Sequence, residues 1–254
     1  MTITFKPLNE SHFPLLLKWL ESPHIKKWYD QDVRYTLELV HEKYSSYIKG
    51  YKLEGGVQRP IQGFIIHNNQ NPVGYIQVYN AYDFPRSKPL SGLPESLGAI
   101  DIFIGEEEAL GRGLGADSIK LFLETYGFPN YRYIFADPKC KNEIGVNTYE
   151  KAGFVIWKRV DREFWMVAHK KIVRLSIFDM IALETVFKQV FLPNDRLWVF
   201  GSRADLTKKG GDIDLYVETY AKTIDDAVEM KSKYIIRLED IIGEQKIDLV
   251  LNMI

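Results

Sequence analysis

Hydrophobic residues follow two different spacings in the first eighty positions. They recur at helical spacing through 15–20, where Ser11 can cap the helix and Pro14 suits its first turn. From residue 61 onwards they form short β-branched and aromatic runs, interrupted at 68–71 by a turn signal of Asn and Gln. The predicted elements are helices over 11–20 and 36–48, then a β-hairpin with strands over 61–67 and 73–79.

The pattern changes again after a proline-containing stretch over 81–98. This stretch has no regular spacing and is longer than most ordered connections, which predicts a functional or mobile loop. Short apolar runs then alternate with amphipathic segments, and Gly153 suits a left-handed helix end. The predicted order is strand 99–104, helix 114–126, strand 131–136, helix 142–152 and strands 154–160 and 164–169. Residues 1–170 therefore predict an α+β domain with a mixed sheet.

A second unit is predicted over 174–254. Ser176 can cap a helix that runs to 190, and the remaining pattern alternates between strands and one long helix. The predicted elements are helices 176–190 and 224–242 and strands 197–200, 212–217 and 246–251. These elements describe a small α/β domain, and its boundary near 170–174 depends on the change of pattern alone, because no Gly-, Ser- or Pro-rich linker precedes it.

Composition narrows the class of protein. The 254 residues are 46% hydrophobic, enough for a proper core, and 33 Lys and Arg oppose 34 Asp and Glu, which gives no global basic field for a nucleic-acid partner. Cys140 stands alone and cannot form an intrachain disulfide, and the first residues lack the features of a signal peptide. No apolar run approaches the roughly 20 residues that cross a bilayer. We therefore expect a cytoplasmic protein without a membrane partner.

A glycine-rich turn lies between the predicted strand 99–104 and the helix that follows it. Glycines allow close approach of the backbone, and a helix start directs free amide hydrogens at an anion, so a pyrophosphate would fit here. The plainer interpretation is a tight strand-to-helix turn. The surrounding elements do not form the opening βαβ unit of a dinucleotide fold, and the turn lacks the Gly-Lys-Ser/Thr ending of a Walker loop. The candidate cofactor residues are Gly111, Arg112, Gly113, Leu114, Gly115 and Ala116.

Six sequence blocks together resemble the GNAT acyltransferases over nearly all of residues 1–170, and most closely the aminoglycoside 6′-N-acetyltransferases. The resemblance implies a GNAT mixed sheet flanked by helices, with acetyl-CoA bound through its pyrophosphate at the glycine turn. One departure is Leu110, where most of the superfamily has Gln or Arg, although the aminoglycoside branch is similar there. The blocks are His24–Tyr29, Pro72–Gln77, Ile100-Asp101, Leu110–Gly115, Ala136–Pro138 and Tyr149–Phe154.

Acetyl transfer to an amine needs a base for the incoming nitrogen and a proton for the leaving thiolate. Strand alternation places Asp101 opposite an apolar stripe of isoleucines, and the resemblance implies that it is the base; the alternative is an acid on a solvated face. Tyr149 matches the family's proton donor, although a tyrosine more often packs. Asn142 is a predicted helix cap. It either also contacts the cofactor or serves only as a cap.

The resemblance also implies a polycationic aminoglycoside as the acceptor, bound by carboxylates such as Asp101 and Asp137. The run Glu106–Glu108 is a weaker candidate, better interpreted as a solvated loop. Gln77, Trp28 and Tyr29 match family positions near the acceptor, and the two aromatics could equally pack in the core. Siderophore precursors and peptide amines are alternative acceptors, because their acyltransferases share much of this pattern.

Three aspartates in the tail suggest a second site. Strand spacing places Asp212 and Asp214 on one face, and Asp248 is the only acid in an otherwise apolar strand; converging acids favour magnesium. With Gly201 and Ser202 they resemble the DNA polymerase β-type nucleotidyltransferases. That resemblance implies that a nucleoside triphosphate binds at the Gly-Ser pair, that the first two aspartates bind metal, and that Asp248 binds metal and activates an acceptor hydroxyl.

The tail departs from its aminoglycoside-modifying relatives in length, because the sequence ends six residues after Asp248. This departure leaves three interpretations: an active minimal enzyme, a domain that needs a partner or a dimer, and a non-catalytic nucleotide- or partner-binding module. The alternative to any second site is that Asp212 caps a turn and that Asp248 lies at the edge of the sheet.

Overall fold

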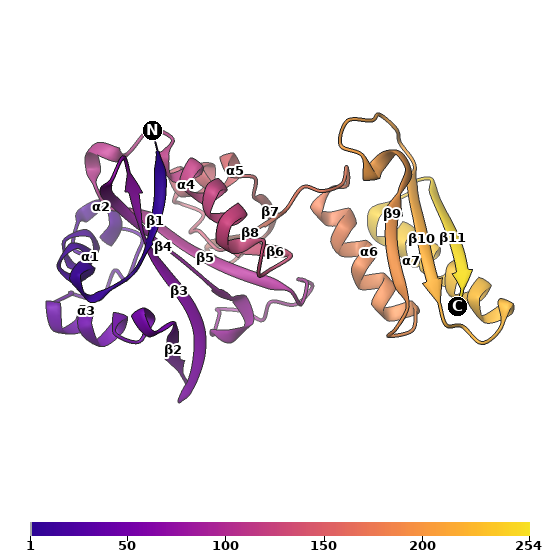
Figure 1. Cartoon of the computed structure of the whole chain (residues 1–254), viewed down its shortest axis with the longest axis horizontal. Helices are drawn as coiled ribbons and strands as arrows, with labels where there is room; N and C mark the ends of the chain where they lie inside the picture. Colours follow the sequence, from indigo (N-terminus) through magenta and orange to yellow (C-terminus); the bar gives the residue numbers. More distant parts are fainter. Residues whose placement is uncertain (1) are drawn as a thin grey trace. The chain divides into compact units, whose positions relative to one another are not determined.

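Strand pairing separates the chain into two units in the computed structural model, which describes residues 2–254. One unit ends at Lys170 and the other runs from Lys171 to Ile254. The first contains a mixed sheet in the order β1-β3-β4-β5-β6-β8-β7, with β2 paired to β3 (Figure 1). Its strands are β1 Ile3–Pro7, β2 Tyr51–Glu54, β3 Val57–Asn68, β4 Asn71–Asn80, β5 Leu97–Ile104, β6 Tyr133–Ala136, β7 Val155–Val160 and β8 Glu163–His169.

Helices cover the two faces of this sheet separately. On one face α4 (Leu114–Phe122) and α5 (Glu143–Lys151) bury their apolar residues against the strands in a continuous core. Helices α1 (Phe13–Leu20), α2 (Pro23–Lys26) and α3 (Leu37–Tyr44) lie together on the other side (Figure 1). The fully buried Trp19 of α1 packs edge-on against Phe103 of β5, with ring centroids 6.2 Å apart. The predicted mixed sheet flanked by helices is confirmed.

The predicted hairpin is confirmed as β3 and β4. Asn69 and Gln70 connect the strands with left-handed φ angles of 48° and 74°, a conformation that the twist of a two-residue hairpin turn requires. The sequence did not predict β1 or β2, because four or five half-exposed residues carry too short a pattern.

Three helix predictions need correction at their ends. Ser11 does not cap α1; it donates a 2.6 Å hydrogen bond to Asn9 Oδ1, and Asn9 caps a short 3-10 turn over Glu10–His12. The predicted helix over 36–48 ends at Tyr44 and is followed by a 3-10 turn, Tyr47–Lys49. The helix predicted to Tyr126 ends as an α-helix at Phe122 and continues as a π turn, Leu123–Gly127.

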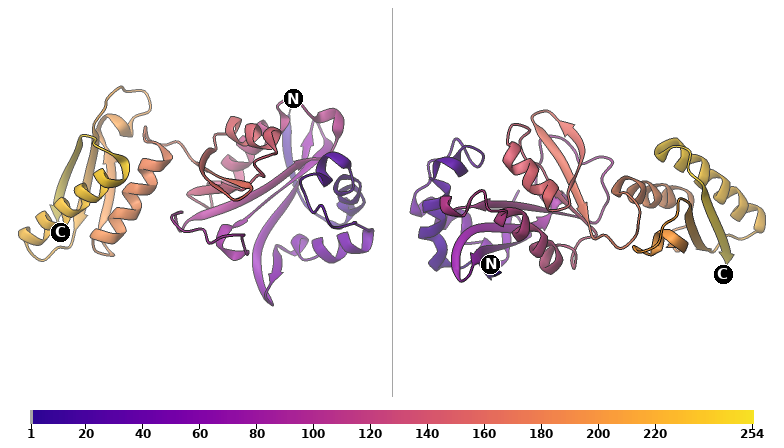
Figure 2. Two further views of the ribbon diagram at one scale, coloured as in Figure 1. Left: turned by 180° about the vertical axis from the view of Figure 1, so that it is seen from behind. Right: turned by 90° about the horizontal axis from the view of Figure 1, so that it is seen from above.

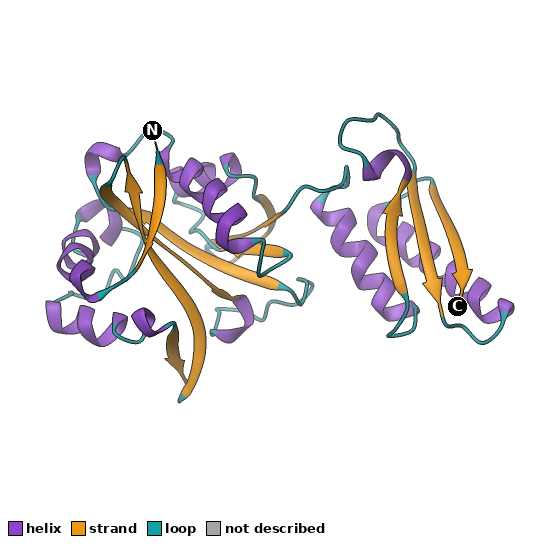
Figure 3. Cartoon of the chain, in the orientation of Figure 1, coloured by secondary structure: helices purple, strands orange, loops and turns teal. Residues whose placement is uncertain are grey.

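The second unit has a three-stranded sheet in the order β11-β10-β9. Helices α6 (Ile177–Val190) and α7 (Ile224–Ile242) both lie on one face of it (Figures 2 and 3). There the buried Leu183, Tyr234 and Leu238 pack against the inward residues of the strands. The opposite face is open, with Trp198 40% and Val250 49% exposed. The strands are β9 Arg196–Phe200, β10 Ile213–Thr219 and β11 Ile247–Met253.

None of the helices in residues 2–254 combines the length and the apolar composition that a bilayer crossing demands.

Candidate active site

Strands β5 and β6 run parallel but stay paired for only three residues. Leu97, Gly98 and Ala99 pair with Tyr133–Phe135, whereas β5 stays paired with β4 as far as Ile104. Beyond Ala99, the main chain of β5 therefore has no strand from residues 2–254 on its second edge, and its peptide groups are available to an extended ligand. Asp101 lies on this unpaired stretch.

The glycine turn stands at the carboxyl end of β5, where α4 begins. Gly111 and Gly113 have left-handed φ angles of 72° and 78°, and no atom lies within 4 Å of the position that a Cβ would take at either residue. Gly113 is the N-cap of α4 and places no side chain on the first amide groups of the helix. Those amides and the positive end of the helix dipole suit a phosphate, so the turn fits the pyrophosphate of a nucleotide cofactor.

A cavity of about 420 Å³ adjoins this turn. Arg112 and Leu114 line it together with the β3–β4 turn and the acids Glu106 and Glu108. Glu106 is already engaged, because Lys18 Nζ lies 2.7 Å from its carboxylate and the indole of Trp19 donates to it at 2.8 Å. Glu106 is therefore part of the scaffold and not of a solvated loop, whereas Glu107 and Glu108 are exposed and lie in a 3-10 turn, Glu107–Ala109.

Asp101 sits in a line of polar side chains on one face of β4 and β5. Gln77 stands directly opposite it in the antiparallel register and donates a 2.6 Å hydrogen bond from Nε2 to its carboxylate. Tyr75 in turn donates to Gln77 Oε1 at 2.8 Å. Two residues further along the same face, the Tyr79 hydroxyl also acts on Asp101 and lowers the pKa of its carboxyl. The carboxylate is thus positioned by β4 and remains partly exposed.

Burial raises the pKa of Asp101, and the nearby charge of Asp137 raises it further. Arg86 and the hydrogen bonds from Gln77 and Tyr79 act in the opposite direction without cancelling the shift. A carboxylate whose pKa has moved up towards the working pH is a better proton acceptor than an ordinary surface aspartate. The electrostatics therefore fit the role that the sequence resemblance implies for Asp101.

Asp137 directly follows β6, on the other side of the gap from Asp101. Its carboxylate forms an ion pair with Nη1 of Arg86, a residue of the loop between β4 and β5. The Arg86 side chain is only 12% exposed, and its guanidinium carbon lies 5.0 Å from the centroid of the Phe135 ring. The structure therefore places both predicted carboxylates in one site and adds a buried cation between them.

Tyr149 of α5 is 9% exposed. Burial, assisted by the negative charges of Asp101 and Asp137, raises the pKa of its phenol. The hydroxyl consequently keeps its proton throughout the neutral range and can donate a hydrogen bond to a developing anion.

The remaining predicted residues have mixed outcomes. Asn142 caps α5, because its Oδ1 accepts from Gly145 N at 3.0 Å; a Cβ at Gly145 would collide with this side chain. Tyr29 packs against Phe103 of β5 with ring centroids 5.6 Å apart. Burial raises the pKa of its hydroxyl, and the negative charge of Asp101 adds to the shift. Trp28 is partly buried and stacks under Lys27, at 4.8 Å.

Three site residues were not identified from the sequence. Tyr75 and Tyr79 share the alternation of Gln77, so the spacing 75, 77, 79 was an available signal. Arg86 offered no comparable signal, because it lies in an irregular loop 51 residues before its partner Asp137.

The three aspartates of the second unit do not come together as the predicted magnesium site. Asp214 and Asp248 are register neighbours on parallel strands, but Asp212 lies before β10 and pairs with Lys246 at 2.5 Å. Within residues 2–254 no group of three His, Cys, Asp or Glu side chains is arranged to hold a metal ion. The residues therefore do not fit a three-carboxylate metal site, because Lys246 already neutralises one of its members.

Gly201 and Ser202 form a short turn after β9. Gly201 has a φ of 65°, and a Cβ there would lie 2.0 Å from Asp214 Oδ2, so only glycine permits this approach. The Ser202 hydroxyl faces Gly210. Nη2 of Arg174 donates hydrogen bonds to the main-chain carbonyls of Ser202 and Gly210 and so connects the two segments. Gly201 therefore lies directly beside Asp214, and the binding of a triphosphate at the Gly-Ser pair stays a prediction.

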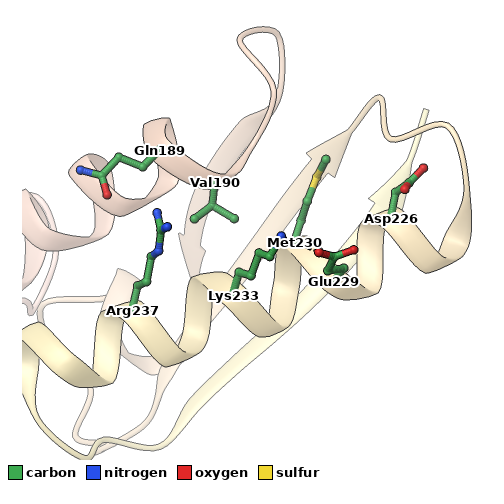
Figure 4. A pocket seen from close by; sticks show the side chains of 7 residues that line it. All are labelled: Gln189, Val190, Asp226, Glu229, Met230, Lys233 and Arg237. Atoms are coloured by element: carbon green, nitrogen blue, oxygen red, sulfur yellow. Dashed lines mark ion pairs between the residues drawn. The ribbon is translucent and has the colours of Figure 1, made fainter.

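A further groove of about 270 Å³ lies between α6 and α7 (Figure 4). Charged side chains of both signs line it, and Lys233 and Glu229 neutralise each other at 2.5 Å. It contains none of the residues that the sequence singled out.

Comparisons with known proteins agree with this geometry for the first unit. Two relatives, each an aminoglycoside N(6′)-acetyltransferase type 1, come from Klebsiella pneumoniae and Serratia marcescens. Each is 27% identical over 155 residues, which are 60% of this chain and 74% of the relative.

Two solved structures of AAC(6′)-Ib are similar in fold. One, in complex with ribostamycin and coenzyme A, has a TM-score of 0.59 at 25% identity, and covers 67% of this chain and 95% of the other. The second, in complex with coenzyme A and kanamycin, has a TM-score of 0.57 at 26% identity, with coverage of 67% and 96%. The sequence profile of the acetyltransferase (GNAT) domain matches residues 9–162, more than half of the chain. On this evidence the chain belongs to the GNAT acetyltransferase family.

Proposed function

We propose that the first unit is an acetyl-CoA-dependent N-acetyltransferase that modifies the 6′-amine of aminoglycosides. The observation that carries the proposal is the position of Asp101, on the unpaired stretch of β5 and hydrogen-bonded by Gln77. The similarity to enzymes whose structures hold coenzyme A with kanamycin or ribostamycin supports the choice of both substrates.

Each residue would then have a defined task. The glycine turn at Gly111–Gly113 and the first amides of α4 hold the pyrophosphate. Acetyl-CoA supplies an activated acetyl thioester. Asp101 takes the proton that the acceptor ammonium must lose before its nitrogen forms the new C–N bond. When the C–S bond breaks, Tyr149 gives its proton to the leaving sulfur, and the second proton that the nitrogen loses as it becomes an amide restores the phenol.

Asp101 and the aromatic Tyr29 face the acceptor in this arrangement, and Asp137 lies beside them in its ion pair with Arg86. An aminoglycoside is a polycation, and a carboxylate such as Asp101 binds an ammonium group through charge-assisted hydrogen bonds. Tyr29 contributes an apolar surface beside Phe103.

The test is release of the CoA thiol, followed spectrophotometrically with kanamycin or ribostamycin as acceptor. We expect turnover that requires both substrates, and mass spectrometry should place a single acetyl group on the 6′-amine. Acetyl-CoA binding without turnover of any aminoglycoside contradicts the substrate assignment. Hydroxylamine-type amines and peptide N-termini serve as the alternative acceptors in the same assay.

For the second unit we propose a nucleotidyltransferase-type scaffold that binds a nucleotide or a partner without transferring a group. The close approach of Gly201 to Asp214 and the pairing of Asp214 with Asp248 support the scaffold. The ion pair between Asp212 and Lys246 supports the absence of transfer.

Incubation with radiolabelled ATP and magnesium tests the proposal for the second unit. We expect no covalent labelling of any acceptor by the wild-type chain and a shift of the unit's hydrogen-exchange protection on adding nucleotide. Magnesium-dependent labelling that Asp212→Ala abolishes would show instead that the unit is an active transferase.

A further inference from the structure

Arg86 is a charged residue of the acceptor site to which neither the sequence pattern nor the family resemblance assigns a role. It belongs to the irregular stretch between the 3-10 turn Ala81–Asp83 and β5, drawn as loop in Figure 3. Its guanidinium forms an ion pair with Asp137 and donates a 3.1 Å hydrogen bond to the Tyr79 hydroxyl. The Tyr79 hydroxyl in turn acts on Asp101 and lowers the pKa of its carboxyl. A continuous chain of contacts therefore joins the two carboxylates through a buried cation.

The guanidinium is held by packing as well as by charge. Its central carbon lies 5.0 Å from the Phe135 ring centroid and 5.7 Å from that of Tyr79, distances at which a cation is attracted to an aromatic face. An arginine with 12% exposure that is stacked between two rings is an ordered part of the site rather than a mobile surface side chain.

One donor of this guanidinium remains unsatisfied. Nε of Arg86 is buried and has no hydrogen-bond partner within the part of the chain that the structure describes. A buried N–H without an acceptor costs free energy, which an oxygen of a ligand recovers if the ligand displaces the side chains that cover this nitrogen. A ligand ammonium cannot supply it, because it carries only donors and repels the guanidinium.

We propose that Arg86 is a specificity-determining residue, which occupies Asp137 and thereby selects acceptors that present an oxygen, rather than a second ammonium, beside the reacting amine. The proposal rests on the proposed acetyl transfer and adds the class of acceptor to it. Asp101 stays available for the reacting nitrogen, while Asp137 is withdrawn from acceptor binding by its ion pair with Arg86.

Kanamycin A and kanamycin B provide a matched pair of acceptors, because they carry a hydroxyl and an amine, respectively, at one position of the ring that bears the 6′-amine. We expect the wild-type enzyme to have the higher kcat/KM for kanamycin A. Arg86→Ala should raise the ratio of kcat/KM for kanamycin B over A by about tenfold, the effect of one charged hydrogen bond. Arg86→Gln, which removes the charge but fills more of the space, should raise the ratio in the same direction.

Arg59 supplies the matched control. It pairs with Asp83 at 3.2 Å at the start of the same loop and, within residues 2–254, forms no ion pair with Asp101 or Asp137. Arg59→Ala should therefore leave the ratio unchanged. An unchanged ratio in both Arg86 variants, or an equal change in Arg59→Ala, overturns the proposal, since the loop's order rather than the guanidinium would then set the preference.

A titration of the Asp101 carboxyl by carbon NMR separates this proposal from the acetyl-transfer proposal, because it needs no acceptor. If neither kanamycin is acetylated, the proposed function fails, and the titration still shows whether Arg86 acts on Asp101. We expect its midpoint to move to higher pH in Arg86→Ala and to stay in place in Arg59→Ala; an unmoved midpoint in Arg86→Ala overturns the inference. The other titratable groups that interact electrostatically with Asp101 are the same in both variants: Tyr29, Tyr47, Tyr75, Tyr79, Asp137 and Tyr149.

Discussion

Each unit of the chain contains a shielded aspartate, and the two differ in what surrounds them. Asp195 of the second unit is 8% exposed and accepts hydrogen bonds from the amides of Leu192 and Tyr220 and from the hydroxyl of Thr219, at 2.8–3.0 Å. Asp101 of the first unit accepts from side chains alone and has a second acid nearby.

This difference separates a structural acid from a chemical one. The two amides belong to the turns before β9 and after β10, so the charge of Asp195 stabilises one conformation of the polypeptide there. The partners of Asp101 are side chains on a rigid strand, and its raised pKa makes the gain and loss of a proton accessible. Burial of a carboxylate is therefore no sign of catalysis by itself. The kind of hydrogen-bond donor and the neighbouring charge decide whether the carboxylate has a structural or a catalytic role.

The sharpest test of this comparison is Asp101→Asn. It removes the proposed base while keeping the shape, and it should lower kcat/KM for acetyl transfer by about 10²–10⁴-fold, the contribution of general base catalysis. Acetyl-CoA affinity, measured by calorimetry, should not change. Asp161→Asn, in the exposed turn between β7 and β8, is the control and should retain full activity. Activity within a few-fold of wild type in Asp101→Asn would remove Asp101 from the mechanism.

Asp195→Ala should have the converse effect, on stability rather than on chemistry. It leaves three donors without their acceptor, and we expect it to lower the stability of the second unit by about 2–4 kcal/mol. Hydrogen exchange should report faster exchange in β9 and β10 and unchanged exchange in β4 and β5. Asp248→Ala, at an exposed position of the same sheet, should leave both sets of amides as they are. Equal effects of the two variants would contradict the structural role of Asp195.

The glycine turn permits a smaller and more selective change. Gly113→Ala introduces a side chain at a φ of 78°, a conformation that costs an L-residue about 1–2 kcal/mol. Relief of that strain should displace the first amides of α4 and raise the KM for acetyl-CoA by about tenfold. Gly50→Ala imposes a similar strain at a φ of 84° outside the site, and it should leave this KM unaltered.

The smallest expected effect is a difference in how stability depends on pH. Because the folded-state pKa of Asp101 is raised, its contribution to the free energy of unfolding falls as pH rises from the unfolded pKa, about 3.9, through the folded one. At Asp30 burial acts to raise the pKa, but Lys43 at 2.6 Å outweighs it and the pKa is lowered. Asp30 therefore stabilises above the unfolded pKa and loses that contribution as pH falls through its lowered folded pKa.

Denaturant unfolding of wild type, Asp101→Asn and Asp30→Asn at pH 4 and pH 7 measures these slopes. Relative to Asp101→Asn, the wild type should lose stability between pH 4 and pH 7, and relative to Asp30→Asn it should gain stability. Slopes of the same sign in the two comparisons would show that the surroundings of Asp101 do not shift its titration.

The sequence alone determined the local features of this protein. Alternation placed Asp101 opposite the isoleucines of its strand, the glycine spacing located the turn before α4, and helical periodicity gave α7 its bounds, Ile224–Ile242. Each of these depends on neighbours within a few residues, whose backbone geometry a periodic pattern reports directly. The six blocks together also indicated the family that the comparisons show.

The tertiary structure alone decided which charges meet. Arg86 pairs with Asp137, 51 positions later in the sequence, and this pair places a buried cation in the acetyl-transfer site. Lys246 pairs with Asp212, 34 positions earlier, and this pair removes one carboxylate from the predicted magnesium site. The early separation of β5 from β6 was equally hidden, because pairing between strands depends on register and not on the composition of either strand. Electrostatic partners are set by distance in space, and a linear pattern carries no record of that distance until the sheet has assembled.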